Sequence, residues 1–190
     1  MDTIWIIDGA YMMKSGSNHG KIDYMRLKQF LEKTNETDFR ETYYLNSTAN
    51  LQAEQSFHNW LKSAPPHGPK MRVKLYDLKR MNLKCISCGN EFDREVQKGV
   101  DVGIATLMIK LACQNQYNRL ILSAGDGDFE DAIDYVKSDL HKEIWIAAFD
   151  GSVSLDLQSY ADRVLWLNDY WEEIKKNLVV RPELALYRNE

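Results

Sequence analysis

The sequence lacks any apolar run of 18 residues, the length that a membrane-spanning helix requires. Its N-terminus, Met1-Asp-Thr, leads directly into a strand-like segment, with no basic region and no cleavage site of a secretory signal. Cysteine is scarce, because three residues among 190 leave no disulfide framework, which is typical of a reducing compartment. We therefore expect a cytoplasmic protein with no membrane partner.

Positive charge is also in short supply. The chain has 24 Lys and Arg against 28 Asp and Glu, a formal charge of −4. This balance argues against a protein that binds nucleic acid over its whole surface, although it allows a local basic patch. With 44% hydrophobic residues and no internal repeat, the chain is long enough for one full-sized core. Residues 1–178 are predicted to form one domain, and residues 179–190 a polar tail.

Strand-like and helix-like segments alternate along the chain. Apolar runs and alternating patterns predict strands near residues 4–8, 40–45, 71–76, 119–123, 143–149 and 163–167. Helical spacing predicts helices near residues 22–31, 50–61 (with Asn50 as N-cap), 99–112, 129–140, 153–160 and 170–178. Residues 8–20 are predicted to be a polar, glycine-rich loop. This order predicts an α/β fold with a mostly parallel sheet and helices on both faces.

Two of the predicted strands end in acidic residues. Ile4-Trp-Ile-Ile runs into Asp8, and Leu120-Ile-Leu-Ser-Ala-Gly leads into Asp126 and Asp128. In an open parallel sheet, functional residues gather outside the carboxyl ends of the strands, where the strand order reverses. If the chain winds one way through its first three strands and then reverses, these two strands are neighbours. Asp101, at the start of the preceding helix, is close enough in sequence to join them.

Carboxylates that converge without matching Lys or Arg repel one another unless a cation lies between them, and hard oxygen ligands select Mg²⁺ or Mn²⁺. A carboxylate-held Mg²⁺ that keeps several waters can activate one of them as nucleophile and neutralise charge on a phosphodiester oxygen. This is the chemistry of metal-dependent nucleases. The candidate catalytic and metal-binding residues are therefore Asp8, Asp101, Asp126 and Asp128.

Helix capping is the alternative explanation for these acids. An Asp before an amphipathic helix is commonly an N-cap, and acids in a first turn complement the helix dipole. One cap requires one acid, whereas Asp126, Asp128, Glu130 and Asp131 lie within six residues. Asp8, at the end of a buried strand, is expected to gain nothing from a helix N-terminus. Taken together, the acids favour a metal site.

Basic residues gather between Lys70 and Lys84, where Asp77 is the only acid. This run could guide a single nucleic-acid strand by charge and by stacking on Tyr76, although an ordinary polar strand face explains it equally well. Lys98, near the predicted helix N-terminus, could hold the scissile phosphate, and a solvated lysine is its alternative explanation. The candidate nucleic-acid contacts are Lys74, Lys79, Arg80 and Tyr11.

Residues 79–98 interrupt the alternation of strands and helices and are predicted to be an inserted loop. They contain Cys85-Ile-Ser-Cys88-Gly89, which has the form of half a zinc ribbon. Zinc requires four ligands, and Cys113 lies in an apolar helical pattern. His67, His141, an acid or the pair of a second chain would have to complete the site. Free thiols are the alternative, so zinc and a homodimer both stay open.

Three motifs in order carry a resemblance to a known family. They are Ile-Ile-Asp8-Gly-Ala-Tyr, Lys98-Gly-Val-Asp101-Val and Ile-Leu-Ser-Ala-Gly-Asp126-Gly-Asp128-Phe. Over residues 3–167 the chain resembles the NYN domain family of PIN-like ribonucleases, close to its LabA-like bacterial branch. The resemblance implies a PIN-like three-layer α/β/α sandwich and metal-dependent cleavage of RNA that leaves a 5′-phosphate. It also implies the metal ligands Asp8, Asp101, Asp126 and Asp128.

The chain departs from the family pattern at two positions, and it shares the CxxC insert of the LabA-like branch. Many members have Asn where Tyr11 stands, and commonly Ser where Gly127 stands, so a hydroxyl that could position a phosphate or a ligand water is missing. LabA-like sequences often carry a CxxC insert before the Lys-Gly-Val-Asp motif, which favours zinc at Cys85 and Cys88.

Other functions fit parts of the pattern. A Toprim-type nuclease acting on DNA also has an acid after its first strand and Asp-x-Asp after a later one, but it expects Glu where Asp8 stands. A haloacid-type phosphatase requires a second Asp where Ala10 stands. A catalytically silent RNA-binding or regulatory module could keep the fold for partner contacts. The prediction is a metal-dependent endoribonuclease acting on single-stranded RNA, with RNA versus DNA unsettled because attack by metal-held water does not use the ribose 2′-OH.

Overall fold

The computed structural model describes residues 1–48, 52–96 and 99–177. Six parallel strands form one sheet in the order β3-β2-β1-β6-β7-β8. The chain therefore winds outward through β2 and β3, returns to the centre at β6 and winds the other way. The predicted parallel sheet is confirmed, with the first strand beside the acid-tipped β6. The strands are β1 Thr3–Asp8, β2 Glu41–Thr48, β3 Arg72–Asp77, β6 Arg119–Ser123, β7 Glu143–Ala148 and β8 Arg163–Trp166.

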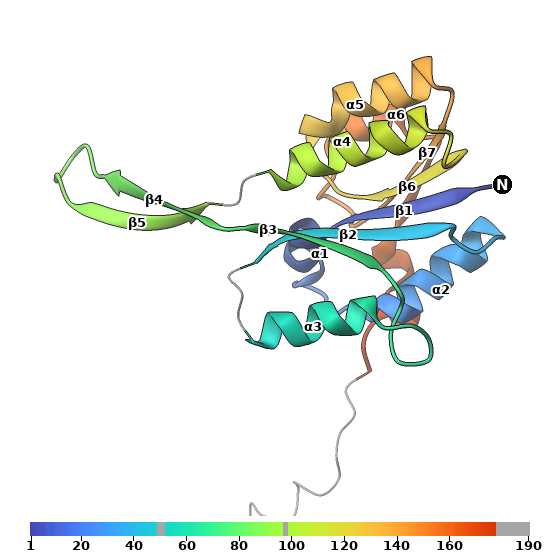
Figure 1. Ribbon diagram of the computed structural model, residues 1–190, viewed down its shortest axis with the longest axis horizontal. Coiled ribbons are helices and arrows are strands. Elements are labelled where there is room, and N and C mark those ends of the chain that lie inside the picture. Colours follow the sequence, from blue (N-terminus) through green and yellow to red (C-terminus); the bar gives the residue numbers. More distant parts are fainter. Residues whose placement is uncertain (49–51, 97–98, 178–190) are drawn as a thin grey trace, which may run out of the picture.

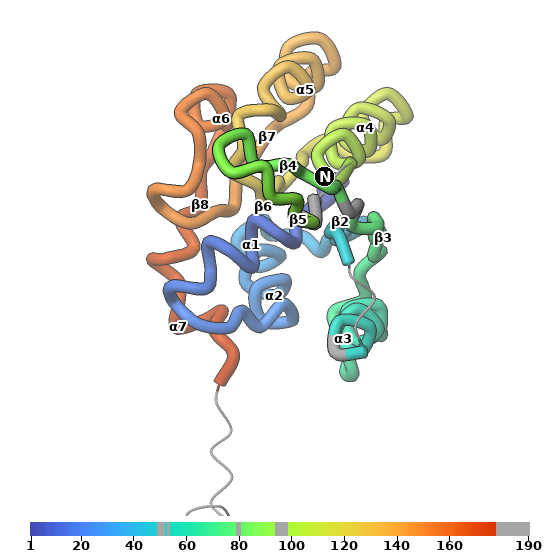
Figure 2. Tube along the Cα trace, turned by 90° about the vertical axis from the view of Figure 1, so that its left-hand side faces the viewer, coloured from blue at the N-terminus to red at the C-terminus, as the bar shows by residue number. Residues whose placement is uncertain are grey.

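Helices cover both faces of this sheet, as the end-on view of Figure 2 shows. One face carries α4 Val100–Cys113, α5 Glu130–Asp134 and α6 Leu155–Tyr160. The other carries α1 Gly9–Gly16, α2 Tyr24–Asn35, α3 Gln52–Lys62 and α7 Trp171–Ile174. Shorter helical turns are η1 Gly127–Phe129, η2 Tyr135–Asp139 and η3 Leu167–Tyr170. The PIN-like three-layer α/β/α sandwich is confirmed. No helix in the described part of the chain is both long and apolar enough to cross a membrane.

The central strand β1 belongs to both halves of the hydrophobic core. All its residues, Thr3 to Asp8, are buried. Because side chains alternate along a strand, Ile4 and Ile6 pack in the cluster that contains α4 and α5, whereas Trp5 and Ile7 pack in the cluster that contains α2. A slip of one residue would exchange the two faces, so packing fixes the register of β1. The core therefore determines where Asp8 lies.

In the main body, two predicted elements differ in the structure. Residues 8–20, predicted to be a loop, contain the helix α1. Its eight residues make only about two turns and include two glycines, so helical spacing is hard to recognise there. The last helix is also shorter than predicted, since α7 ends at Ile174. The predicted N-cap Asn50 and the predicted tail, residues 179–190, lie outside the described residues.

The segment after β3 is a β-hairpin, not the inserted loop that the sequence predicted. Strand β4, Lys79–Lys84, pairs antiparallel with β5, Glu91–Val96. Figure 1 shows this hairpin projecting from the body beyond the end of β3. At its base, Tyr76 packs so closely on Gly103 of α4 that a side chain at Gly103 would collide with the Tyr76 hydroxyl. The hairpin is therefore anchored where β3 ends and α4 begins.

Candidate functional site

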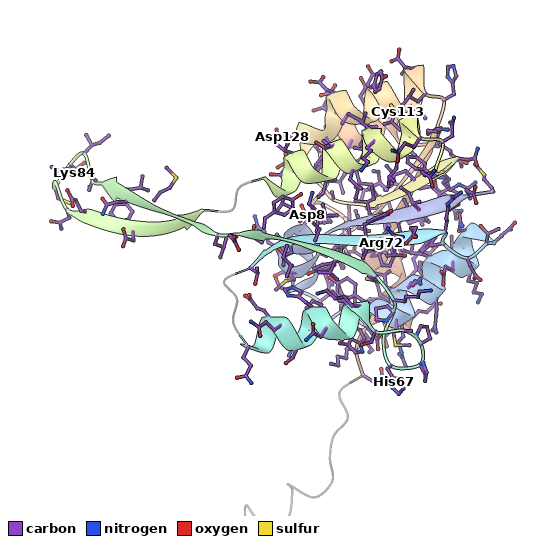
Figure 3. The ribbon with its side chains drawn as sticks, in the orientation of Figure 1. Asp8, His67, Arg72, Lys84, Cys113 and Asp128 are labelled. Atoms are coloured by element: carbon purple, nitrogen blue, oxygen red, sulfur yellow. The ribbon has the colours of Figure 1, made fainter. Side chains whose placement is uncertain are left out.

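The candidate acids meet at the carboxyl edge of the sheet. Ile7 pairs with Ser123, so β1 and β6 end level with each other and Asp8 lies near the turn that holds Asp126. Asp101 lies in the first turn of α4, on the same side. Figure 3 shows Asp8 and Asp128 at this edge, which is also the edge from which the hairpin projects. The arrangement follows directly from the reversal of strand order between β1 and β6.

The carboxylates of this cluster influence one another electrostatically. Asp8 is only 7% exposed, and burial raises its pKa, with smaller contributions from the charges of Asp101 and Asp126. Hydrogen bonds from backbone N–H groups, chiefly that of Tyr11, partly oppose this shift. Burial likewise raises the pKa of Asp101, helped by the charges of Asp126 and Asp128. The negative charges are therefore close enough to repel one another.

No cation of the described residues relieves this repulsion, because none of the four aspartates forms an ion pair there. Equally, no three His, Cys, Asp or Glu side chains in residues 1–48, 52–96 and 99–177 are gathered closely enough to enclose a metal ion. A magnesium ion does not require such a cage, since it commonly binds one or two carboxylates and keeps several waters. The donor set, all hard oxygens beside a sheet edge, fits Mg²⁺ or Mn²⁺.

Two of the acids also cap helices. Asp8 Oδ1 accepts the backbone N–H of Tyr11 at 3.1 Å, so Asp8 is the N-cap of α1. The expectation that Asp8 gains nothing from a helix N-terminus is therefore wrong, because the residues after it are helical. Asp126 Oδ1 accepts the N–H of Asp128 at 3.1 Å, so Asp126 is the N-cap of η1. Each of these bonds uses a single carboxylate oxygen, so capping and cation binding are compatible.

The Tyr11 side chain joins α1 to the segment after β7. Its hydroxyl accepts the N–H of Phe149 at 3.1 Å and hydrogen-bonds Ser152 Oγ at 2.6 Å. Burial raises the pKa of Tyr11, which keeps the hydroxyl protonated and able to donate to Ser152. This hydroxyl therefore supports the fold beside Asp8, while contact between Tyr11 and RNA stays a prediction.

The segment that contains Ser152, Ser154 and Asp156 belongs to the same edge, and sequence reasoning missed it. Backbone groups join it to the acidic turn, since Ser154 N–H donates to the Gly125 carbonyl at 2.9 Å. A Cβ added at Gly127 would lie 3.5 Å from Ser154 Oγ and 4.0 Å from an Asp156 oxygen. The sequence did contain a sign of this segment. Asp150, Gly151 and Ser152 are turn-forming residues that directly follow a predicted strand, at the carboxyl edge where functional residues gather.

Neighbouring groups pack directly against the backbone of Gly125, whereas Gly127 has room for a side chain. A Cβ at Gly125 would collide with the carbonyl oxygen of Ser152 and press on the Tyr11 ring. We expect Gly125→Ala to lower the free energy of unfolding by about 1–3 kcal/mol, the usual effect of overpacking. Gly127→Ser is the matched control, because its Cβ meets only ordinary contacts, and we expect a change within about 0.5 kcal/mol. Chemical denaturation measures both variants, and equal stabilities would contradict this account of Gly125.

The basic residues between Lys70 and Lys84 do not form the purely basic surface that the sequence suggested. Lys74 is exposed on β3, and its Nζ lies 5.0 Å from the centre of the Tyr76 ring. Lys79 and Arg80 belong to β4, and β5 supplies acids along the facing strand, with Glu91 opposite Lys84 in the register. The hairpin is therefore of mixed charge rather than purely basic. Lys98 lies outside the described residues, so its role stays a prediction.

The two cysteines of the CxxC motif lie at the hairpin tip. The backbone N–H of Cys88 donates to the Cys85 sulfur, as do the Cys88 thiol and the N–H of Ser87, and these bonds lower the pKa of Cys85. Figure 3 shows Cys113 and His67 on the main body, far from Lys84, which precedes Cys85. Neither can complete a metal site at the tip of its own hairpin.

Comparison with known proteins gives the chain a family. The model of the NYN domain matches residues 3–168. Low amplitude and bright protein LabA from Synechococcus elongatus is 28% identical over 178 residues, which cover 93% of this chain and 88% of that protein. A protein of unknown function from Vibrio parahaemolyticus has a crystal structure with a TM-score of 0.64 at 19% identity, covering 91% of this chain and 96% of that one, which shows the fold alone. Because the family model spans most of its length, the chain belongs to the NYN domain family.

Proposed function

We propose that the protein is a metal-dependent endoribonuclease that hydrolyses phosphodiester bonds of single-stranded RNA. Membership of the NYN domain family supports a nuclease-type function. The acidic cluster supports the finer proposal: burial raises the pKa values of Asp8 and Asp101, the neighbouring carboxylates add to this shift, and none of the four aspartates has an ion-pair partner in the described residues. The family match also favours this function over the Toprim-type alternative. We keep residues 1–178 as one domain, and the scarcity of cysteine supports a cytoplasmic location.

In this proposal Asp8, Asp101, Asp126 and Asp128 hold Mg²⁺ or Mn²⁺. When bound, such a cation supplies charge neutralisation at a phosphodiester oxygen and activation of a water molecule. The contribution of the chain is positioning. Core packing fixes β1, and the N–H groups of Tyr11 and Asp128 hold the two capping carboxylates before any substrate arrives. Lys98 is the proposed contact for the scissile phosphate.

The proposed RNA path follows the end of β3 toward the base of the hairpin. This segment leaves the sheet at the edge where Asp8 and Asp128 lie (Figure 3). Lys74 supplies an exposed charge there, close to the aromatic ring of Tyr76. Charge that follows a backbone, combined with aromatic rings, binds single strands with little sequence preference.

Cleavage assays test the proposal directly. Purified protein is incubated with mixed single-stranded RNA, and separately with single-stranded DNA of the same sequence, in Mg²⁺, in Mn²⁺ and in chelator. We expect RNA products with 5′-phosphates in either metal and none in chelator. Cleavage of the DNA alone would assign the other substrate. Folded protein that binds RNA but cuts neither nucleic acid would support the catalytically silent RNA-binding or regulatory module instead.

The basic residues make a separate prediction about salt. We expect the triple variant with Lys74, Lys79 and Arg80 replaced by Ala to bind RNA more weakly. The slope of log affinity against log salt should decrease by about 0.7 for each phosphate of the single strand that is no longer neutralised. Fluorescence anisotropy over a series of salt concentrations, in chelator to prevent cleavage, measures this slope.

A charge-matched control separates a local path from general attraction. Replacing Lys33, Lys62 and Lys110 by Ala removes the same total charge from α2, α3 and α4. The slope for this control should stay close to the wild-type slope, because these lysines lie on helices away from the end of β3. If the two triple variants behave alike, the proposed path is wrong.

A further inference from the structure

The hairpin tip presents two thiols on one tight turn. The Gly89 N–H donates to the Cys85 carbonyl at 2.8 Å, and the Cys85 N–H donates to the Asn90 carbonyl at 2.8 Å. Gly89 adopts a φ of 72°, in the left-handed region that favours glycine. A Cys-x-x-Cys pair held on one tight turn has the spacing that structural zinc sites use for two of their four ligands.

At this tip, the described residues of one chain supply only half of a zinc site. Structural zinc is almost always bound by four ligands in a tetrahedron. Cys113 lies at the C-terminal end of α4 and His67 follows α3, and both are remote from the hairpin tip (Figure 3). Among the described residues, no three His, Cys, Asp or Glu side chains are grouped to hold a metal ion. The described residues therefore supply two of the four ligands, which leaves two for a partner to provide.

The hairpin also exposes apolar side chains around these thiols. Ile86 lies between the two cysteines and is fully exposed, and Met81 and Phe92 on the strands are exposed as well. A two-stranded hairpin that projects alone is only marginally stable in water. Because a symmetric contact uses the same patch on both subunits, a second copy of this chain would cover the apolar tip and supply the two missing thiolates together.

We propose that two copies of this chain share one zinc ion at their hairpin tips, bound by Cys85 and Cys88 of each copy. This inference goes beyond the nuclease function and does not depend on it. Six residues at about 3.3 Å each carry the tip about 20 Å from the base of the hairpin. Contact between the tips would therefore leave the acidic edge of each body open to solvent.

Zinc content and molar mass test this proposal together. The full chain is purified under reducing conditions, dialysed with zinc, and examined by elemental analysis and light scattering. We expect about 0.5 zinc per chain, because four thiolates require two chains, and the mass of a dimer. A strong zinc chelator should convert this dimer to monomer, and added zinc should restore it. The chelator arm needs no variant, so the test holds even if a cysteine variant folds poorly.

Cysteine variants locate the site. Cys85→Ser should lose both the zinc and the dimer, whereas Cys113→Ser, which changes the third and exposed cysteine, should keep both. Zinc retained by Cys85→Ser would place the ion elsewhere and overturn the proposal. One zinc per monomer, no zinc at all, or a dimer that survives both the chelator and Cys85→Ser would overturn it as well. None of these readouts depends on RNA cleavage, so they are independent of the nuclease proposal.

Discussion

Replacing Asp126 with Asn is expected to slow RNA cleavage about a thousandfold, because a carboxylate-held cation supplies several kcal/mol to the transition state and each 1.36 kcal/mol is a factor of ten. The amide oxygen of Asn can still accept the N–H of Asp128, so the turn should stay intact. Binding of RNA in chelator should be at least as tight as in the wild type, since a negative charge is removed. Single-turnover cleavage in Mn²⁺ and anisotropy in chelator measure the two quantities.

Asp23→Asn is the matched control for this variant. Asp23 also caps a helix, α2, and accepts the N–H groups of Met25 at 3.0 Å and Arg26 at 3.2 Å, but it lies outside the acidic cluster. The same chemical change at this cap should leave the cleavage rate at the wild-type value. An Asp126→Asn protein that cleaves within tenfold of the wild type would show that this carboxylate is a helix cap and no part of the reaction.

The second large effect concerns stability and needs no substrate. Asp8 is buried and repelled by Asp101 and Asp126, whereas Asn would keep the cap of α1 without the charge. In chelator, Asp8→Asn is therefore expected to melt at a higher temperature than the wild type. Manganese at 100 times its dissociation constant should stabilise the wild type by about 2.7 kcal/mol and Asp8→Asn by less. Melting curves of both proteins, with chelator and with Mn²⁺, test this reversal.

The pH dependence of that difference has a defined sign. A carboxyl whose pKa is raised in the folded state stabilises the fold when it is protonated. For Asp8 this contribution is complete below the ordinary value of 3.8 and is lost as pH rises through the raised pKa. The advantage of Asp8→Asn in chelator should therefore be largest near neutral pH and disappear toward pH 3.8. An advantage that does not change with pH, or that Asp23→Asn shares, would mean that charge in the cluster is not its cause.

Buried strands were the most predictable part of this fold. β1 and β6 are continuous apolar runs because both faces of the sheet are covered, and such runs stand out in a sequence. Their adjacency followed from the rules for winding an open sheet, which placed Asp8 and Asp126 on a common edge. The NYN motifs gave the same four aspartates by an independent route.

The features that escaped prediction depend on distant contacts or on elements without a buried face. Strands β4 and β5 form a hairpin with exposed side chains on both faces, so no apolar alternation marks them. The basic residues of β4 therefore looked like one isolated run, and the acidic partner strand was overlooked. The bond between Tyr11 and Phe149 joins residues 138 positions apart and leaves no local signal.

The close packing of Tyr76 on Gly103 closes the body of the protein beneath the hairpin. Both ends of the hairpin thus leave from a single point, between the end of β3 and the start of α4. The hairpin is therefore a replaceable unit: a shorter turn or another small module could take its place without altering the register of any strand in the main sheet. What the protein carries at this point can therefore be exchanged without moving Asp8 or the turn after β6, while Lys79 and Arg80, the proposed RNA contacts on β4, would be exchanged together with the hairpin.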